Sequence, residues 1–181
     1  EGRYRLTDSF TDDLNDWMND GGRLIAIGYA NRYLEGEGGF ALSGSSNGNG
    51  TSDSTPPTEG YSEQSRKSIS NQIPGAIFKA KVDNTHPLGF GFPEYYFTLK
   101  TSSSTYTYQE KAWNVVTIGT ADFVKGFAGA NAKKAQKQSI VAAVQRKGRG
   151  AITYLVDNPL YRGFWEQGKF LFSNAVFFAG Q

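Results

Sequence analysis

Cysteine is absent from this 181-residue chain, and histidine occurs once, as His86. The first absence excludes disulfides, thiolate metal sites and a cysteine nucleophile. The second makes a His-rich metal site untenable, because histidine is the commonest metal ligand. No apolar run approaches the roughly 18 residues of a membrane span. A net charge of +2 is too small to indicate a polyanion. We therefore expect no cofactor in this chain, no membrane span and no nucleic-acid partner.

Aromatic residues and glycine are plentiful. The chain has 13 Phe, 10 Tyr, 3 Trp and 22 Gly, and hydrophobic residues make up 38% of it. A chain of this length can bury a core without covalent staples. The numbers predict one globular domain over residues 1–181.

The opening of the chain predicts an α/β layer unit. Residues 7–20 have a helical apolar stripe of Phe10, Leu14, Trp17 and Met18. Gly21-Gly22 supplies a helix stop. The continuous apolar run 24–27 then predicts a central strand that is covered on both faces.

Period-2 alternation and turn residues predict the remaining elements. A helix follows at about 165–178, with a buried stripe of Trp165, Phe170, Leu171, Ala175 and Phe178. Residues 129–138 fit a helical turn or a loop. We expect strands at 75–82, 95–99 and 114–118, and a β-hairpin of 139–145 with 151–156.

Two segments differ in composition from the rest. Residues 43–60 contain no hydrophobic residue, which predicts a flexible low-complexity loop. Residues 123–156 carry seven Lys or Arg and no acid. We interpret the basic segment as a solvated face with a basic hairpin turn, since no recognised nucleic-acid motif accompanies it.

Asp83 and His86 lie in one predicted turn. The pair suggests a site histidine with a nearby carboxylate. The alternative is a turn histidine whose ring bonds a backbone carbonyl. No Gly-x-Ser-x-Gly elbow accompanies them to complete a triad.

Asp157, Arg162 and Trp165 lie between a predicted strand and the last helix. Ligands of open α/β sheets collect at the carboxyl ends of strands, so Arg162 is a candidate anion clamp. In the alternative, Asp157 caps a turn and Arg162 pairs with it or covers an aromatic ring. Trp165, Phe164 and Tyr161 could stack on a sugar or serve as core.

The order of helix, Gly-Gly, strand and glycine turn resembles the nucleophile elbow of class I glutamine amidotransferases. In that family a Gly-x-Cys-x-Gly turn presents the thiol. The matching segment here is 27–32, with Ala30 where the cysteine would be. The resemblance implies a degenerate nucleophile position, because a methyl group cannot attack a carbonyl.

A further resemblance covers nearly the whole chain. It is to the amidotransferase-like C-terminal domain of bacterial, Bacteroidetes-type zinc carboxypeptidases of the carboxypeptidase A-like family. In that family a separate catalytic domain binds zinc through His-x-x-Glu and a later His, which this chain lacks. The segments that carry the resemblance are 14–26, 85–91, 148–150, 157–165 and 174–175.

The resemblance implies a three-layer, flavodoxin-like or amidotransferase-like α/β sheet with helices on both faces, without its first β/α units. An edge strand left open would need a cover. The implied function is a non-catalytic accessory domain of an exported, periplasmic or secreted enzyme. Its partner would be the N-terminal catalytic domain of the same polypeptide, which would hold the zinc, with a peptide or glycan substrate.

Two other functions stay open. One is a carbohydrate- or small-ligand-binding module that uses Trp165, Tyr161 and Arg162. The other is a hydrolase that uses His86 with Asp83.

Overall fold

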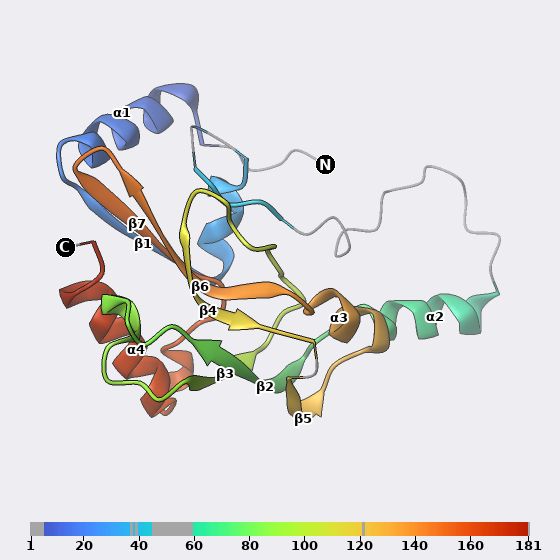
Figure 1. The fold of residues 1–181 in the computed structure, drawn as a ribbon. Coiled ribbons are helices and arrows are strands. Elements are labelled where there is room, and N and C mark those ends of the chain that lie inside the picture. Colours follow the sequence, from blue (N-terminus) through green and yellow to red (C-terminus); the bar gives the residue numbers. More distant parts are fainter. Residues whose placement is uncertain (1–5, 37, 39, 45–59, 121, 181) are drawn as a thin grey trace.

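A computed structural model describes residues 6–36, 38, 40–44, 60–120 and 122–180. Within them, seven strands form one mixed sheet, with the order β1-β7-β6-β4-β2-β3 and β5 paired to β2 (Figure 1). The expected flexible loop at 43–60 lies outside the described residues, apart from its ends at 43–44 and 60. In the part of the chain that is described, no helix is long and apolar enough to cross a membrane.

Helices are interspersed among the strands along the chain. The α-helices are α1 (Asp8–Asn19), α2 (Tyr61–Ser70), α3 (Ala130–Ala135) and α4 (Glu166–Phe177). Short 3-10 helices are η1 (Gly28–Leu34), η2 (Pro87–Gly89) and η3 (Tyr161–Gly163). The strands are β1 (Arg23–Ile27), β2 (Gly75–Val82), β3 (Tyr95–Lys100), β4 (Trp113–Ile118), β5 (Phe123–Phe127), β6 (Ser139–Lys147) and β7 (Gly150–Leu155).

Strand pairing is parallel between β1 and β7 and antiparallel in the other pairs. β2 is the hub of one half of the sheet, because it pairs with β3 along one side and with β4 and β5 along the other. The β2–β5 register shifts at Ile77 and Phe78, which marks a β-bulge.

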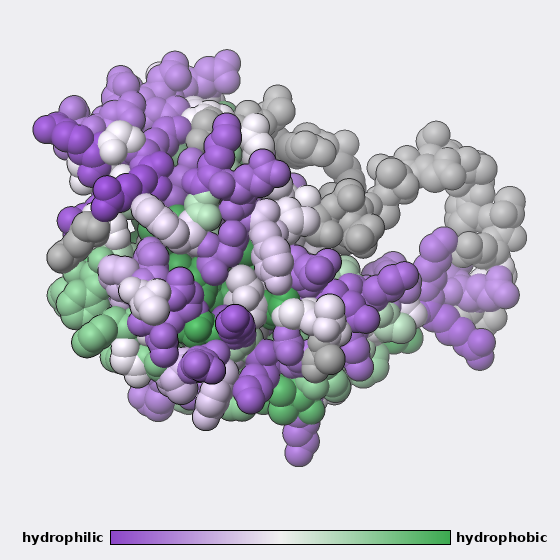
Figure 2. Space-filling view, viewed as in Figure 1, coloured by the Kyte–Doolittle hydropathy of each residue, from purple (hydrophilic) through white to green (hydrophobic). Residues whose placement is uncertain are grey.

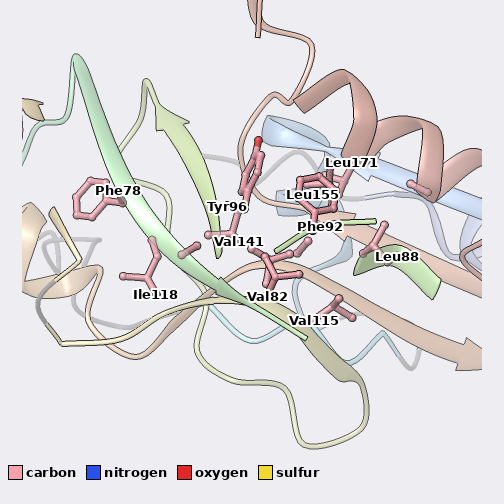
Figure 3. Packing of buried hydrophobic residues seen from close by; sticks show 14 of the residues in the cluster. Phe78, Val82, Leu88, Phe92, Tyr96, Val115, Ile118, Val141, Leu155 and Leu171 are labelled. Atoms are coloured by element: carbon pink, nitrogen blue, oxygen red, sulfur yellow. The ribbon is translucent and has the colours of Figure 1, made fainter. Parts of the chain in front are cut away.

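Two hydrophobic clusters lie on opposite faces of the sheet. One contains Leu88, Leu171 and Ala175, so η2 and α4 cover that face (Figure 3). The other contains Met18 and Leu34 from α1 and η1. Alternate residues of β7 enter the two clusters. The predicted fold class, an α/β sheet with helices on both faces, is confirmed.

The start and end of α1 follow the sequence signals. The Thr7 hydroxyl accepts a hydrogen bond from Phe10 N–H at 3.3 Å and caps the helix. Gly21, with φ +109°, ends it, and Gly22 N–H bonds back to Trp17. The expected buried stripe is only partly right: Met18 is buried, but Phe10 and Trp17 are about half exposed, at 52% and 50%.

The hairpin of β6 and β7 is confirmed, with Lys147 opposite Gly150. A two-residue loop of Gly148 and Arg149 closes it. Gly148 has φ +57°, which such tight loops require. Each of the six residues of β7 is buried, which explains why its sequence is a nearly continuous apolar run.

The prediction that 24–27 is a central strand is wrong. β1 lies at the edge of the sheet, and of its residues only Ala26 is fully buried. A short apolar run in a sequence does not show whether the strand is central in the sheet or lies at its edge. Helix α2 and strand β5 were not anticipated, because α2 is polar around most of its surface and β5 carries Lys125 and Gly126.

Helix α4 forms where expected, but its stripe differs. Leu171 and Ala175 are buried as predicted, and Asn174, which the predicted stripe did not include, is buried beside Ala175. The Asn174 side chain donates to the carbonyls of Leu88 and Phe90, at 3.1 and 2.8 Å, which fixes α4 to η2. Phe170 and Phe178 stay about 40% exposed. Figure 2 shows hydrophobic surface at the α4 end of the molecule.

Candidate functional site

An apolar groove of about 470 Å³ lies between the sheet and the start of α4. Its floor comes from three neighbouring strands and its wall from the segment that leads into the helix. The lining residues are Ile77, Phe97, Val124, Phe164, Trp165, Glu166 and Gln167. Trp165, one of the residues singled out from the sequence, therefore lines a hollow in the surface rather than only filling the core.

The wall of the groove is fixed to the free edge of β3. The Trp165 indole Nε1–H donates to the Phe97 carbonyl at 2.9 Å. The Gln167 side-chain oxygen accepts from Phe97 N–H at 3.3 Å. Two side chains thus satisfy both backbone groups of Phe97, where a further strand would otherwise bind.

The groove opens on the outer face of β2. Ile77 lines it, and Lys79 follows two positions later, so both side chains project to the same face. Lys125 is the register partner of Ile77 on β5. Glu166, the carboxylate of the lining, pairs with Lys169 at 2.6 Å.

Asp157 lies behind this wall, on the buried side of β3. Its carboxylate bonds Lys100 Nζ at 2.9 Å and the Thr98 hydroxyl at 2.6 Å. Lys100 is fully buried, so the ion pair is shielded from solvent. Burial, with a smaller contribution from the Asp157 charge, raises the pKa of the neighbouring Tyr96 phenol above its ordinary value. The structure makes Asp157 an internal anchor.

Arg162 does not join Asp157. Its backbone has φ +49°, a left-handed conformation that is uncommon outside glycine. The guanidinium lies over the Tyr161 ring, 5.3 Å from its centroid. The interpretation that Arg162 covers an aromatic ring fits this geometry, whereas Asp157 pairs with Lys100.

Asp83 and His86 share a turn but bond different partners. The Asp83 carboxylate accepts from the Thr85 amide and hydroxyl, at 3.1 and 2.6 Å. The His86 Nδ1 accepts from Leu88 N–H at 3.1 Å and so caps η2. Its ring lies 5.6 Å from that of Trp113. The turn interpretation of His86 is right in kind, although the ring accepts from an amide instead of donating to a carbonyl.

The pKa values of this pair shift downward. Burial lowers the pKa of His86, and the Asp83 charge opposes that effect. The hydrogen bond from the Thr85 hydroxyl is the main cause that lowers the pKa of Asp83. Both shifts keep the carboxylate charged and the imidazole neutral near pH 7.

Ala30 lies exposed on η1, after the carboxyl end of β1. Its neighbour Asn31 is fully buried and donates to the carbonyls of Gly28 and Leu155, at 2.9 and 2.8 Å. Asn31 therefore holds the turn against β7. Across the described ranges, no three His, Asp or Glu side chains gather as metal ligands would.

Several residues of this region escaped the sequence reasoning. Thr98 and Lys100 are 57 to 59 positions before Asp157, and a lysine in a strand is typical of an exposed face. The available signal was the alternation of β3, which places Tyr96, Thr98 and Lys100 on one face. Val124 gave no signal, because β5 itself was not anticipated.

Comparison with known proteins adds little. No family model matches the chain, and no curated protein matches it. Among solved structures, it is similar to a putative ThuA-like protein from Bacteroides uniformis, with a TM-score of 0.47 and 12% sequence identity. The match covers 94% of this chain and 63% of that chain. At this level of similarity the match says nothing about function.

The expected resemblance to a carboxypeptidase domain needs correction. The matching solved structure is described as ThuA-like and not as part of a carboxypeptidase, and no family model supports the link. The motifs that suggested it were short and rich in glycine, and such turns recur for backbone reasons in unrelated proteins. The accessory role rested on that resemblance and stays an untested prediction.

Proposed function

We propose that this chain is a binding module that takes a small, mainly apolar ligand in the groove beside Trp165. The observation that carries the proposal is the groove itself: about 470 Å³, within the usual range for small-ligand sites, and walled mainly by aromatic and aliphatic side chains. No reaction is proposed for it.

The lining favours an apolar ligand over a carbohydrate. Sugars need several free donors and acceptors beside a stacking ring. Here the Trp165 indole N–H and the Gln167 oxygen are both bonded to Phe97, and Glu166 is paired with Lys169. The aromatic faces that remain suit a flat ring or a short aliphatic chain.

Tryptophan fluorescence tests the proposal directly. Trp17 and Trp113 are about half exposed, so Trp17→Phe and Trp113→Phe should leave the fold intact and make Trp165 the reporter. We expect 1-naphthol, or another aromatic probe without an indole ring, to change the Trp165 emission in a saturable way. Cellobiose should leave that emission unchanged.

A filled groove supplies the matched control. Val124→Phe adds a ring inside the groove and should abolish saturable binding. Val176→Phe adds the same ring to an exposed position on α4 and should not. Equal binding by the two variants, or no saturable response from any probe, would refute the proposed function.

A further inference from the structure

The outer face of β2 and β5 places two lysines beside the groove. Lys125 is the register partner of the lining residue Ile77, and Val124, its neighbour in sequence, also lines the groove. Lys79 follows Ile77 by two positions on the same face. Both lysines thus lie next to residues that line the groove, at its sheet side.

These two cations are available to a ligand. Lys125 is exposed and has no ion-pair partner among the residues that the structure describes. Lys79 Nζ lies over the Tyr95 ring, 4.6 Å from its centroid, which is a weak interaction at an exposed site. The one carboxylate of the lining, Glu166, is already paired with Lys169 at 2.6 Å.

The opposite rim carries partial positive charge as well. Helix α4 begins at Glu166, and its N-cap, Trp165, makes no side-chain capping hydrogen bond. The first N–H groups of a 12-residue helix therefore lie at the groove wall without a side-chain acceptor from the cap. This feature adds to the lysines and does not make a site alone.

We infer that the ligand is an anionic amphiphile: a small molecule with an apolar ring or chain and one carboxylate. The apolar part lies between Phe97, Val124 and Trp165, and the carboxylate pairs with Lys125 and Lys79. This inference rests on the proposed function and names the ligand class of the same groove. Charge complementarity selects this occupant over a neutral or cationic one.

Calorimetric titration with three probes of one shape tests the inference. The probes are 1-naphthoate, 1-naphthol and 1-naphthylmethylammonium. We expect 1-naphthoate to bind about fivefold more tightly than 1-naphthol, the effect of one partly screened ion pair, and the cation to bind most weakly. The advantage should shrink between about 0.05 M and about 0.5 M salt.

Charge reversal assigns the lysine. Lys125→Glu should remove the preference for 1-naphthoate and leave the affinity for 1-naphthol unchanged. Lys111→Glu is the control, since Lys111 is an exposed lysine in the turn before β4. Both substitutions change the net charge equally, so a non-specific effect of charge would appear in both variants.

The outcomes separate the two claims. Equal affinities for 1-naphthoate and 1-naphthol, unaffected by Lys125→Glu, would overturn the inference and leave the proposed function intact. No binding of any probe would refute both. Binding to phosphatidylglycerol vesicles without binding to 1-naphthoate would overturn the free small-molecule ligand. A dimer in sedimentation that Val124→Phe dissociates would assign the groove to a second copy and would also overturn it.

Discussion

The two faces of β2 and β3 place polar residues in opposite circumstances. On the inner face, Thr98 and Lys100 are buried and both bond Asp157. On the outer face, Lys79 is exposed, as is Lys125, which lies opposite Ile77 on β5. β3 supplies the inner pair, whereas β2 and β5 supply one outer lysine each. The two pairs lie on opposite faces of one sheet because successive side chains of a strand alternate between the faces.

The difference separates structural polar groups from binding ones. A buried charge must be satisfied within the protein, and once satisfied it has nothing to offer a ligand. An exposed lysine without an ion-pair partner contributes little to folding and keeps its charge for a partner. Substitutions on the two faces should therefore affect different measurements.

The largest effect is expected at Asp157. Asp157→Ala leaves the Lys100 charge buried without its counter-ion, and the free energy of unfolding should fall by about 3–5 kcal/mol. Urea unfolding followed by circular dichroism measures it. The double variant Asp157→Leu, Lys100→Met removes both charges and should recover most of that loss. A single variant as stable as the parent would contradict the buried ion pair.

Thr98→Val should have a smaller effect on the same face. The substitution keeps the shape of the side chain and removes one hydrogen bond to the carboxylate, which is worth about 1.5–3 kcal/mol because the acceptor is charged. The same unfolding measurement applies. Thr117→Val, at a partly buried threonine of β4, is the matched control. If both variants lose equal stability, the hydrogen bond from Thr98 to Asp157 contributes no more to the free energy of unfolding than an ordinary threonine hydroxyl.

His86 extends the comparison to a half-buried group. Its pKa in the folded chain lies below the ordinary value of 6.5, mainly because of burial. The unfolded chain then binds more protons below pH 6.5, so stability is full above that pH and falls as the pH drops through it. Unfolding free energies between pH 8 and about 5 should show this loss, smaller than that of Thr98→Val.

His86→Asn should flatten this pH dependence, because asparagine can keep an acceptor for Leu88 N–H but does not titrate. Asp83 does not interfere, because its lowered pKa means that its own contribution to stability is full above pH 3.8 and is lost only below that pH. An unchanged slope in the His86 variant would show that another group titrates.

The smallest effect on stability is expected on the outer face. Lys125→Ala should change the free energy of unfolding by no more than about 0.5 kcal/mol, because the side chain is exposed and has no ion-pair partner in the described part of the chain. Urea unfolding of this variant beside Asp157→Ala gives the sharpest contrast between the faces. If Lys125→Ala lowered the free energy of unfolding as much as Asp157→Ala, the distinction between structural and binding polar residues would be wrong.

Local signals predicted much of the fold. The alternation at 75–82 predicted β2 to the residue, and the glycine-bearing turn between β6 and β7 predicted their hairpin. Position within the sheet was not predictable in the same way. The run 24–27 had the composition of a central strand, yet β1 is an edge strand, because strand order depends on pairing partners more than a hundred residues away.

The candidate site was predicted in part. The segment that leads into α4 gave Trp165 and Asp157, but their roles depend on β3, which the chain reaches some 60 residues earlier. Burial decides those roles: Asp157 meets Lys100 inside, and Trp165 faces a groove. Neither the sequence of β3 nor that of the segment before α4 shows by itself that the two segments lie in contact.

Trp165 and Gln167 have a second consequence beyond lining the groove. They alone among the described side chains occupy the Phe97 backbone groups at the edge of the sheet, and rotation of both would free one donor and one acceptor there. An unguarded strand edge is a template for strand addition and aggregation. A ligand that holds Trp165 in place also keeps its hydrogen bond to Phe97 formed. Occupancy of the groove should therefore increase the resistance of the protein to self-association.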